Sequence, residues 1–250
     1  MEITDKHLFF TAIILGVITI ILRLIFGKLP PKEAKAQGTA APAARAAEPR
    51  WYRWTRSFQE TVEVFLSALV LALIIRAFAI QAFKIPSSSM EDTLLIGDHL
   101  LVNKFIYGVR NPFNNQVLIP VREPRRDEIF VFRFPLDPSR DFVKRCIGLP
   151  GDTIEIRDKQ LYRNGQLVEQ PYAVHKDMRL FSRKSKWATE DEKQRDNFKP
   201  FKVPEGQYFA MGDNRDLSND SRFWGTVPAK ELRGTPVLIY WPLDRIRLVK

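Results

Sequence analysis

The sequence predicts a mainly β protein, in which an antiparallel β-sheet domain with a β-extension is anchored by two N-terminal transmembrane helices. Three observations predict this fold. Two long apolar segments stand near the N-terminus, a basic segment rich in Ala and Pro separates them, and the rest of the chain is a series of short alternating runs divided by turn residues. Apolar segments of this length predict membrane spans, and alternating runs predict strands.

The composition fits one or two globular domains and excludes disordered and fibrous proteins. The chain has 250 residues, 45% of them hydrophobic and 27% charged, which is enough for a real core. The net charge of +10 is compatible with binding to nucleic acid or to anionic lipid, so the location of the basic residues along the chain must decide between these two partners. The one cysteine, Cys146, can form no intramolecular disulfide and leaves the redox compartment open. Because no HExxH motif or Cys/His cluster is present, we expect no metal and no cofactor.

The first apolar segment, residues 8–26, is predicted to span a membrane. It is close in length to the roughly 20 residues that a bilayer core requires, and its one charge, Arg23, lies near enough to the end to snorkel. A cleaved secretory signal is the alternative. However, residues 1–7 are not basic, and no small-x-small site follows directly. We therefore expect a retained anchor, with residues 1–7 as a short extracytoplasmic N-terminus.

Residues 27–60 are predicted to form a basic cytoplasmic loop. They show no helical or strand periodicity, and seven Lys and Arg residues outnumber three Glu residues. The second apolar segment, residues 61–83, is predicted to return across the bilayer. The free-energy cost of placing Arg76 in the membrane is smallest if its side chain reaches the head groups. Two spans around a cytoplasmic loop place residues 84–250 on the extracytoplasmic side.

Residues 84–250 predict an antiparallel β domain. Runs such as HLLVNKFIYGV, DEIFVFRF and DTIEIRD are alternating or rich in aromatic residues, and Gly, Pro, Asp and Asn turns separate them. The sequence RNG at residues 163–165 is typical of a hairpin turn. Residues 173–199 are highly charged and aperiodic, so we expect an exposed insertion whose charges form a solvated face.

Three serines in a row, residues 87–89, are the first candidates for chemistry. Apolar residues follow them at once, so a flexible linker describes them poorly. A serine hydroxyl becomes a good nucleophile only when a base removes its proton. The histidines His99 and His175 stand in no motif and are more simply interpreted as strand or surface residues.

A desolvated lysine is the other possible base, since burial lowers the ordinary lysine pKa of about 10.4. Lys144 stands in the apolar run DFVKRCIGLPGD. The pattern alone favours an ordinary strand lysine that faces solvent. Spacing therefore leaves the identity of the base open.

Four segments, in order, resemble the motifs of bacterial type I signal peptidases, the serine proteases that remove signal peptides from exported proteins. PSSSMEDTLLIGD resembles the nucleophile box, DEIFVF a strand box, FVKRCIGLPGD the lysine box, and MGDNRDLSNDSRFWGTVP the third box. The predicted spans and β domain agree, so the resemblance covers most of the chain. It implies a membrane-bound serine endopeptidase with a Ser-Lys dyad that cleaves preproteins after small-x-small sites.

The resemblance also implies roles for single residues. Ser89 matches the nucleophile, and Lys144 matches the general base. Ser87 matches a hydroxyl that forms the oxyanion hole together with the backbone N–H of Ser89, and donors of this kind are each worth about 3 kcal/mol. Ser218 matches the serine that orients the lysine.

Further positions match structural parts and the substrate pocket of the family. Asp220 and Arg222 match an ion pair in the wall of the site, and Arg145 is expected to serve structure or charge balance. Asp213, Asn214 and Arg215 are expected to be turn scaffold. The positions that resemble the lining of the substrate pocket are Phe83, Ile85, Pro86, Met90, Leu94, Leu100, Val131, Asp141, Phe142 and Val143.

Some positions depart from the family's pattern. Glu91 and Asp92 stand where an apolar residue and a proline are usual, and Leu217 replaces a usual asparagine. Asp127-Glu128 stands where Gly-Asp is common. The two acids beside the nucleophile are expected to raise the pKa of the lysine, unless they point to solvent.

The expected partners are preprotein signal peptides, the lipid bilayer and the protein-export machinery, and not nucleic acid. The expected location is the bacterial inner membrane, with the catalytic domain on the periplasmic side.

Two alternative functions stay open. A self-cleaving Ser-Lys protease of the repressor type is soluble, and the two spans argue against it. A non-catalytic membrane-anchored β module of the cell envelope would need neither the serines nor Lys144.

Overall fold

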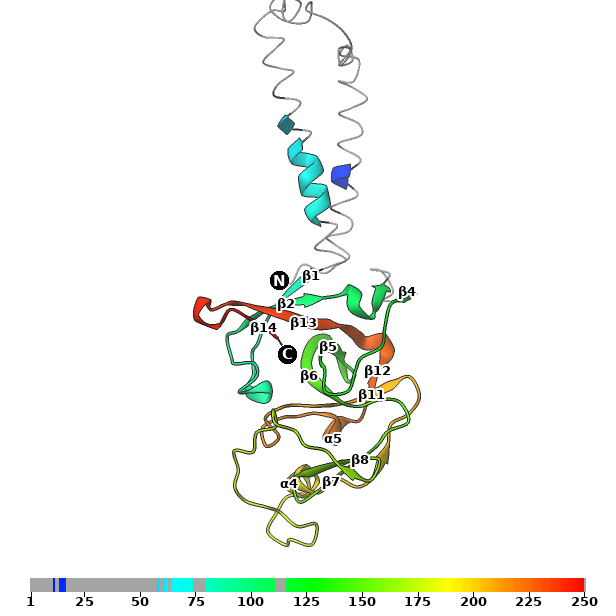
Figure 1. Ribbon diagram of the computed structural model, residues 1–250, viewed down its shortest axis with the longest axis vertical. Coiled ribbons are helices and arrows are strands. Elements are labelled where there is room, and N and C mark those ends of the chain that lie inside the picture. The colour runs from blue at the N-terminus through cyan, green and yellow to red at the C-terminus, as the bar shows by residue number, and fades with distance from the viewer. Residues whose placement is uncertain are drawn as a thin grey trace, which may run out of the picture. The chain divides into compact units, whose positions relative to one another are not determined.

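The computed structural model describes residues 11, 14–16, 58, 61–62, 64–73, 80–110 and 116–249 (Figure 1). The chain divides into two compact units, Met1–Ala79 and Ile80–Lys250. The first unit is described only in short helical pieces, of which the longest covers residues 64–73. Most of the two predicted spans and of the predicted basic loop lies outside the described residues. Within the described residues, no helix is long and apolar enough to cross a membrane.

The predicted C-terminal boundary of the second span, at residue 83, is wrong. Residues 80–83 belong to strand β1 (Ile80–Lys84), which pairs antiparallel with β2 (His99–Asn103). The side chains of β1 alternate between exposed and half-buried, as they do in a strand with one covered face. An apolar run does not by itself distinguish such a strand from the continuation of a helix, so the sequence does not reveal where the helix ends and β1 begins.

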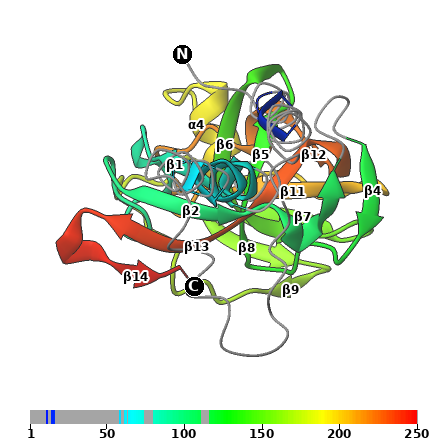
Figure 2. The ribbon, with the colours of Figure 1, turned by 90° about the horizontal axis from the view of Figure 1, so that it is seen from above.

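The second unit is built on an eight-stranded antiparallel sheet, which confirms the predicted β class. Its strand order is β1-β2-β13-β5-β6-β11-β12, and β14 pairs with β13. Figure 2 shows β2 and β13 side by side, with β14 beyond them. The remaining strands of this sheet are β5 (Ile129–Phe134), β6 (Asp137–Gly148), β11 (Gln207–Met211), β12 (Val227–Pro228), β13 (Leu232–Trp241) and β14 (Arg247–Leu248).

Two smaller sheets complete the unit. β3 (Gly108–Arg110) pairs with β4 (Val117–Pro120), and a second sheet has the order β10-β7-β8-β9. The predicted turn at residues 163–165 is confirmed, because Asn164 and Gly165 have φ of 54° and 79° and join paired strands. Positive φ at both central residues is what a type I′ hairpin requires. The strands of this sheet are β7 (Thr153–Arg157), β8 (Gln160–Arg163), β9 (Gln166–Leu167) and β10 (Phe201–Lys202).

Strand β5 lies at the centre of the core because both of its faces are covered. Ile129 and Val131 belong to a first hydrophobic cluster, whereas Phe130 and Phe132 belong to a second hydrophobic cluster. All four side chains are buried. A third cluster forms between β7, β8 and β11. The neighbouring strand β6 is therefore held against a rigid strand along the part that carries Lys144.

Short helices join the strands. Helix α5 (Ser221–Trp224) begins at Asp220, whose side chain accepts from the N–H of Arg222. Short 3-10 turns cover Ser88–Met90, Phe105–Tyr107, Ala229–Glu231 and Leu243–Arg245.

The predicted exposed insertion, residues 173–199, is wrong in part. Its middle is largely exposed, as expected, but its end forms helix α4 (Glu190–Asp196), and Asp196 is fully buried. The helix begins with a capping box in which Thr189 and Glu192 each bond the other's backbone N–H. The spacing Thr-x-x-Glu is a known start signal for a helix, and the charge of the segment obscured it.

Candidate active site

Ser89 lies in the 3-10 turn Ser88–Met90, which follows β1 after a short connection of residues 85–87. The turn is anchored by Met90, which is buried in the first hydrophobic cluster. It is closed by backbone bonds from Glu91 N to Ser88 O at 3.0 Å and from Leu94 N to Met90 O at 2.7 Å. The nucleophile candidate is thus held by packing on one side and by backbone hydrogen bonds on the other.

Lys144 comes from the middle of β6, opposite Phe130 of β5. Its side chain shares a face with Phe142, and Nζ lies 5.6 Å from the centre of that ring. Lys144 is only 3% exposed, and its Nζ lies 2.5 Å from Ser89 Oγ in a hydrogen bond. The structure therefore places the predicted lysine, and not a histidine, beside the predicted serine.

Burial lowers the pKa of Lys144 from 10.5 to about 8. The carboxylates of Asp220 and Asp213 act in the opposite direction, while Arg222 lowers the pKa further. Desolvation prevails because an ammonium loses its hydration inside the protein, whereas these charges partly cancel one another. The lysine is thus poised to gain and lose a proton near neutral pH.

The acidic pair after the nucleophile is not among the charges that shift the pKa of Lys144. Glu91 forms an ion pair with Lys176 at 2.8 Å and accepts from Asn214 Nδ2 at 3.3 Å. Asp92 is exposed and has a φ of 67°. The charges that most affect Lys144 are those of other residues, because one acid is paired and the other points to solvent.

Ser87 is exposed, and its Oγ lies 3.3 Å from Ser89 Oγ. Ser88 lies between these two serines in sequence and makes no side-chain hydrogen bond with the residues that the structure describes. The hydroxyls of two of the three serines therefore lie close together, and the Ser87 side of this pair is exposed.

The predicted third box forms a buried wall. Asp220 and Arg222 make the expected ion pair, with the carboxylate bound at 2.9 Å by both Nε and Nη2. Ser218 is 5% exposed, and its Oγ makes no hydrogen bond of normal geometry within the described part of the chain, so the expected bond to Lys144 is not formed. The backbone of Gly212 passes so close that a Cβ there would lie 2.3 Å from Ser218 Oγ and 2.4 Å from Ser89 O.

The residues expected to be turn scaffold have larger roles. Asp213 is fully buried and accepts from Arg145 Nε at 2.8 Å and Nη2 at 2.6 Å, which gives Arg145 its charge balance. Asp213 also accepts from Thr93 Oγ1 at 2.6 Å. The N–H of Asn214 donates to Ser89 O at 3.1 Å. The loop thus fastens the serine turn to β6.

The residues that resemble the family's pocket lining fall into separate environments. Most of them pack in or against the first hydrophobic cluster, and Leu94, Leu100 and Val131 have no exposed surface there. Phe142 packs against the second cluster, and Asp141 lies 3.6 Å from Arg233 Nε. The first cluster contains Ile85, Met90, Leu94, Leu100 and Val131, and Phe83 and Val143 pack against it, whereas Pro86 is exposed.

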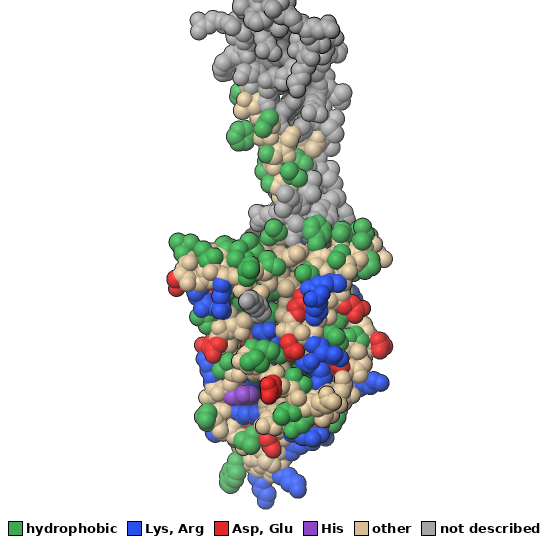
Figure 3. All heavy atoms as spheres, viewed as in Figure 1, with side chains coloured by type: hydrophobic (Ala, Val, Ile, Leu, Met, Phe, Trp, Pro, Cys, Tyr) green, Lys and Arg blue, Asp and Glu red, His purple; other side chains and the backbone are tan. Residues whose placement is uncertain are grey.

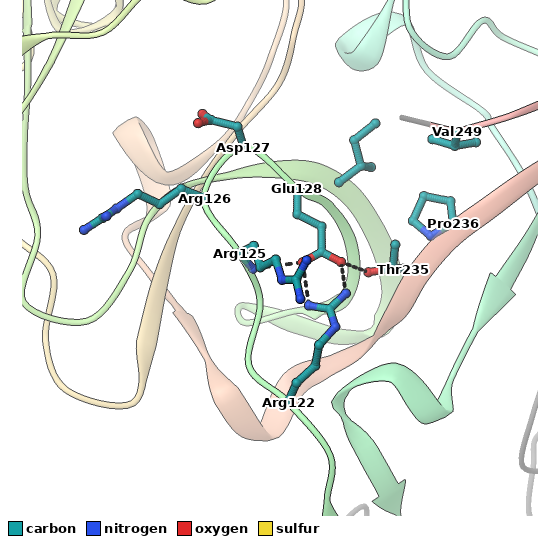
Figure 4. A pocket seen from close by; sticks show the side chains of 9 residues that line it. Arg122, Arg125, Arg126, Asp127, Glu128, Thr235, Pro236 and Val249 are labelled. Atoms are coloured by element: carbon teal, nitrogen blue, oxygen red, sulfur yellow. Dashed lines mark hydrogen bonds and ion pairs between the residues drawn. The ribbon is translucent and has the colours of Figure 1, made fainter.

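A separate pocket of about 340 Å³ lies between the segment before β5 and strand β13. Figure 4 shows the carboxylate of Glu128 facing the guanidinium of Arg122 and the hydroxyl of Thr235. Neither Ser89 nor Lys144 lines it. It therefore lies apart from the candidate active site.

Sequence reasoning missed several residues at the site. Gly212 stands in the quoted third box, and its crowding by backbone and side chain became visible only in space. Thr93 stands in the nucleophile box without a role. Tyr172, whose ring packs on Arg145, stands outside every box, and no motif in the sequence points to it.

Together these features define a class of protein: a β-sheet serine hydrolase in which a buried lysine contacts the serine hydroxyl. Residues 58–241 match the protein-family model described as signal peptidase, peptidase S26. The chain belongs to this family and is a serine endopeptidase.

Three relatives from different bacteria are named signal peptidase I. Signal peptidase I of Pseudomonas aeruginosa is 38% identical over 203 residues, which cover 71% of each chain. That of Aquifex aeolicus is 35% identical over 227 residues, covering 73% of this chain and 84% of its own. A signal peptidase I from Bacillus licheniformis is 36% identical over 192 residues, covering 76% of this chain and 92% of its own.

Proposed function

We propose that this chain removes N-terminal signal peptides from exported preproteins, after small-x-small sites, with Ser89 as nucleophile and Lys144 as general base. The contact of 2.5 Å between Lys144 Nζ and Ser89 Oγ carries the proposal, because it joins a buried amine to a serine hydroxyl. Several relatives are named signal peptidase I, which supports the substrate class.

The chemistry needs no group beyond the chain's own residues and water. A neutral Lys144 accepts the proton of Ser89 as Oγ attacks the scissile carbonyl, and the ammonium that forms then protonates the leaving amine. A water activated by the same amine hydrolyses the acyl-enzyme. With a pKa of about 8, close to a tenth of the lysine is neutral at pH 7, which far exceeds the fraction for an exposed lysine.

Two donors would stabilise the oxyanion. Ser87 Oγ lies 3.3 Å from the attacking oxygen, so it can reach a carbonyl oxygen bound there, and the backbone N–H of Ser89 supplies the second donor. Ser218 has a buried hydroxyl without a hydrogen bond of normal geometry to the described residues. It is available to accept from the lysine ammonium after proton transfer.

The substrate is proposed to lie as an extended strand beside the apolar positions of the first cluster, among them Phe83, Ile85 and Val143. Shallow apolar pockets exclude large side chains sterically, which suits a small-x-small site. Pro86, exposed just before the serines, would border this strand.

We further propose attachment to the inner membrane by the spans predicted near residues 8–26 and 61–79, with residues 80–250 extracytoplasmic and near the export machinery. The surface of the second unit supports contact with lipid. Figure 3 shows apolar side chains gathered over the end of this unit that carries β1, β4 and the β13-β14 hairpin. Exposed apolar residues in these elements include Leu118, Ile119, Trp241 and Leu248. Surfaces of this kind mark contact with a membrane or a protein.

The test is cleavage of a detergent-solubilised preprotein, followed by sequencing of the new N-terminus of the product. We expect cleavage after a small-x-small site by the wild type and by Ser88→Ala, the matched control from the same serine run. Ser89→Ala and Lys144→Ala should both be inactive although folded. Cleavage that persists in Lys144→Ala would overturn the dyad, and a product cut elsewhere would overturn the specificity.

A further inference from the structure

The segment just after β9 runs along the wall of the candidate active site, although no box motif includes it. Val174 forms a parallel bridge with Asn214. Its N–H donates to Asp213 O at 2.8 Å, and its carbonyl accepts from Arg215 N at 2.9 Å. The start of the predicted insertion is therefore hydrogen-bonded to the loop that fastens the serine turn.

The Tyr172 side chain joins this segment to β6 through a contact with Arg145. The guanidinium carbon of Arg145 lies 3.9 Å from the centre of the Tyr172 ring, which is a close cation–π contact. The Tyr172 hydroxyl donates to Asp127 Oδ1 at 2.5 Å and accepts from Gln170 Nε2 at 2.9 Å. Burial, followed by the Asp127 carboxylate, raises the pKa of Tyr172, so the phenol stays protonated and remains a donor.

Asp127 has an unusual backbone conformation at this contact. Its φ of 64° lies in the left-handed region, which favours glycine and tolerates Asp. Its carbonyl accepts from Arg145 Nη1 at 2.7 Å, and its carboxylate also accepts from Arg163 at 3.1 Å. Asp127 and Tyr172 thus hold Arg145 through an edge and a face of the guanidinium.

Arg145 in turn holds the site. Its remaining donors bind Asp213, which also accepts from Thr93 in the segment after the nucleophile. Lys144, next to Arg145 in β6, faces the charges of Asp213, Asp220 and Arg222. A displaced Arg145 would shift the Asp213 carboxylate and leave its charge less compensated beside the lysine.

We propose that Tyr172 is a positioning residue for the serine endopeptidase, holding the Arg145–Asp213 pair that fastens the serine turn to the lysine strand. The inference rests on the proposed Ser89–Lys144 dyad. Tyr172 acts through Arg145 and does not touch the reacting atoms.

The test compares Tyr172→Leu and Tyr172→Phe in the full-length chain in detergent, with a peptide that carries a small-x-small site. Tyr172→Leu removes the ring and the hydroxyl, so we expect kcat to fall about tenfold, with KM nearly unchanged, as loss of one charged contact implies. Tyr172→Phe keeps the ring and should lose less. In Tyr172→Leu the acidic limb of kcat/KM should move to higher pH, because Asp213 raises the pKa of Lys144.

The matched control is Tyr162→Leu, which removes a similar contact, with Arg157 at 4.5 Å, in the β7-β8 hairpin. It should leave kcat and the pH profile unchanged. If Tyr172→Leu, like the control, loses thermal stability without a change in kcat or in the limb, Tyr172 is merely structural and the proposal is wrong. If Tyr172→Leu does not fold, Tyr172→Phe and Asp127→Asn decide by the same readouts.

Ser89→Ala and Lys144→Ala belong in the same assay. Cleavage by either would overturn the dyad whatever Tyr172 does. If both are inactive and the Tyr172 variants match the wild type, only the positioning role fails.

Discussion

At the scale of single residues, one lysine must satisfy two opposed requirements. Lys144 has to be buried to lose its proton near neutral pH, yet an unpaired buried ammonium destabilises the fold. The structure meets both requirements with a hydrogen bond to Ser89 and two carboxylates, Asp220 and Asp213, whose influence is partly offset by Arg222. The pKa of about 8 is the balance of these effects.

This balance predicts the pH dependence of cleavage. The pKa of Lys144 is lowered, so the ammonium form, which cannot act as a base, dominates below pH 8, and the neutral amine dominates above it. We therefore expect kcat/KM to rise with pH along a limb whose pKa is near 8. Peptide cleavage measured from about pH 6 to about pH 10 checks this. A limb at the ordinary lysine pKa would show that the lysine is not desolvated.

Gly212 predicts a steric effect on activity. A Cβ at this position would lie 2.4 Å from Ser89 O, which is backbone and cannot move alone. We expect Gly212→Ala to displace the serine turn and to lower kcat by about 100-fold, the cost of a misplacement of roughly 1 Å. Gly206→Ala is the control, since nothing lies within 4 Å of its Cβ position and only its φ of 68° is strained. Wild-type kcat in Gly212→Ala would contradict the crowding.

At the scale of elements, the turn between β6 and β7 shows how polar side chains hold strands in place. Asp152 accepts from Leu149 N at 2.9 Å, from Arg126 at 2.6 Å and from Asn164 Nδ2 at 2.8 Å. The carboxylate is buried, which alone would raise its pKa, but these donors outweigh burial and lower it from 3.8 to about 2.

This turn predicts a pH-dependent loss of stability. Because the folded pKa of Asp152 is depressed, its contribution is complete above pH 4 and is lost as the pH falls toward 2. We expect Asp152→Asn to lower the free energy of unfolding at pH 7 by about 2 kcal/mol at most, and to cost less as the pH approaches 2. Urea unfolding at several pH values measures this. A pH-independent loss would assign the effect to packing.

At the scale of the whole molecule, the three hydrophobic clusters formed by the described residues all lie within residues 80–249. We therefore expect residues 80–250 to fold alone, with a Tm within about 5 °C of that of the full chain, and to cleave a soluble peptide. Their exposed apolar residues should also make them bind vesicles. Circular dichroism, a peptide assay and vesicle flotation check these outcomes. A fragment that does not fold would show that the first unit is needed for the core.

Much of the fold and the two central positions could be predicted from the sequence. Alternation and the Asn-Gly turn depend on local backbone preferences, and the match of four boxes in order singled out Ser89 and Lys144. The boundary at Ile80 and the helix α4 could not be placed, since one was hidden in an apolar run and the other in a charged run.

By itself the sequence determined the β class and the hairpin turn, because both depend on neighbouring residues, and the match of four boxes in order singled out the candidate serine and lysine. Only the tertiary structure decided that the lysine is buried and that it meets a serine 55 positions away. It also decided that Tyr172, Arg145 and Asp213 come together and that Glu91 is paired with Lys176. Desolvation and charge compensation arise from packing between distant segments, and no local pattern encodes them.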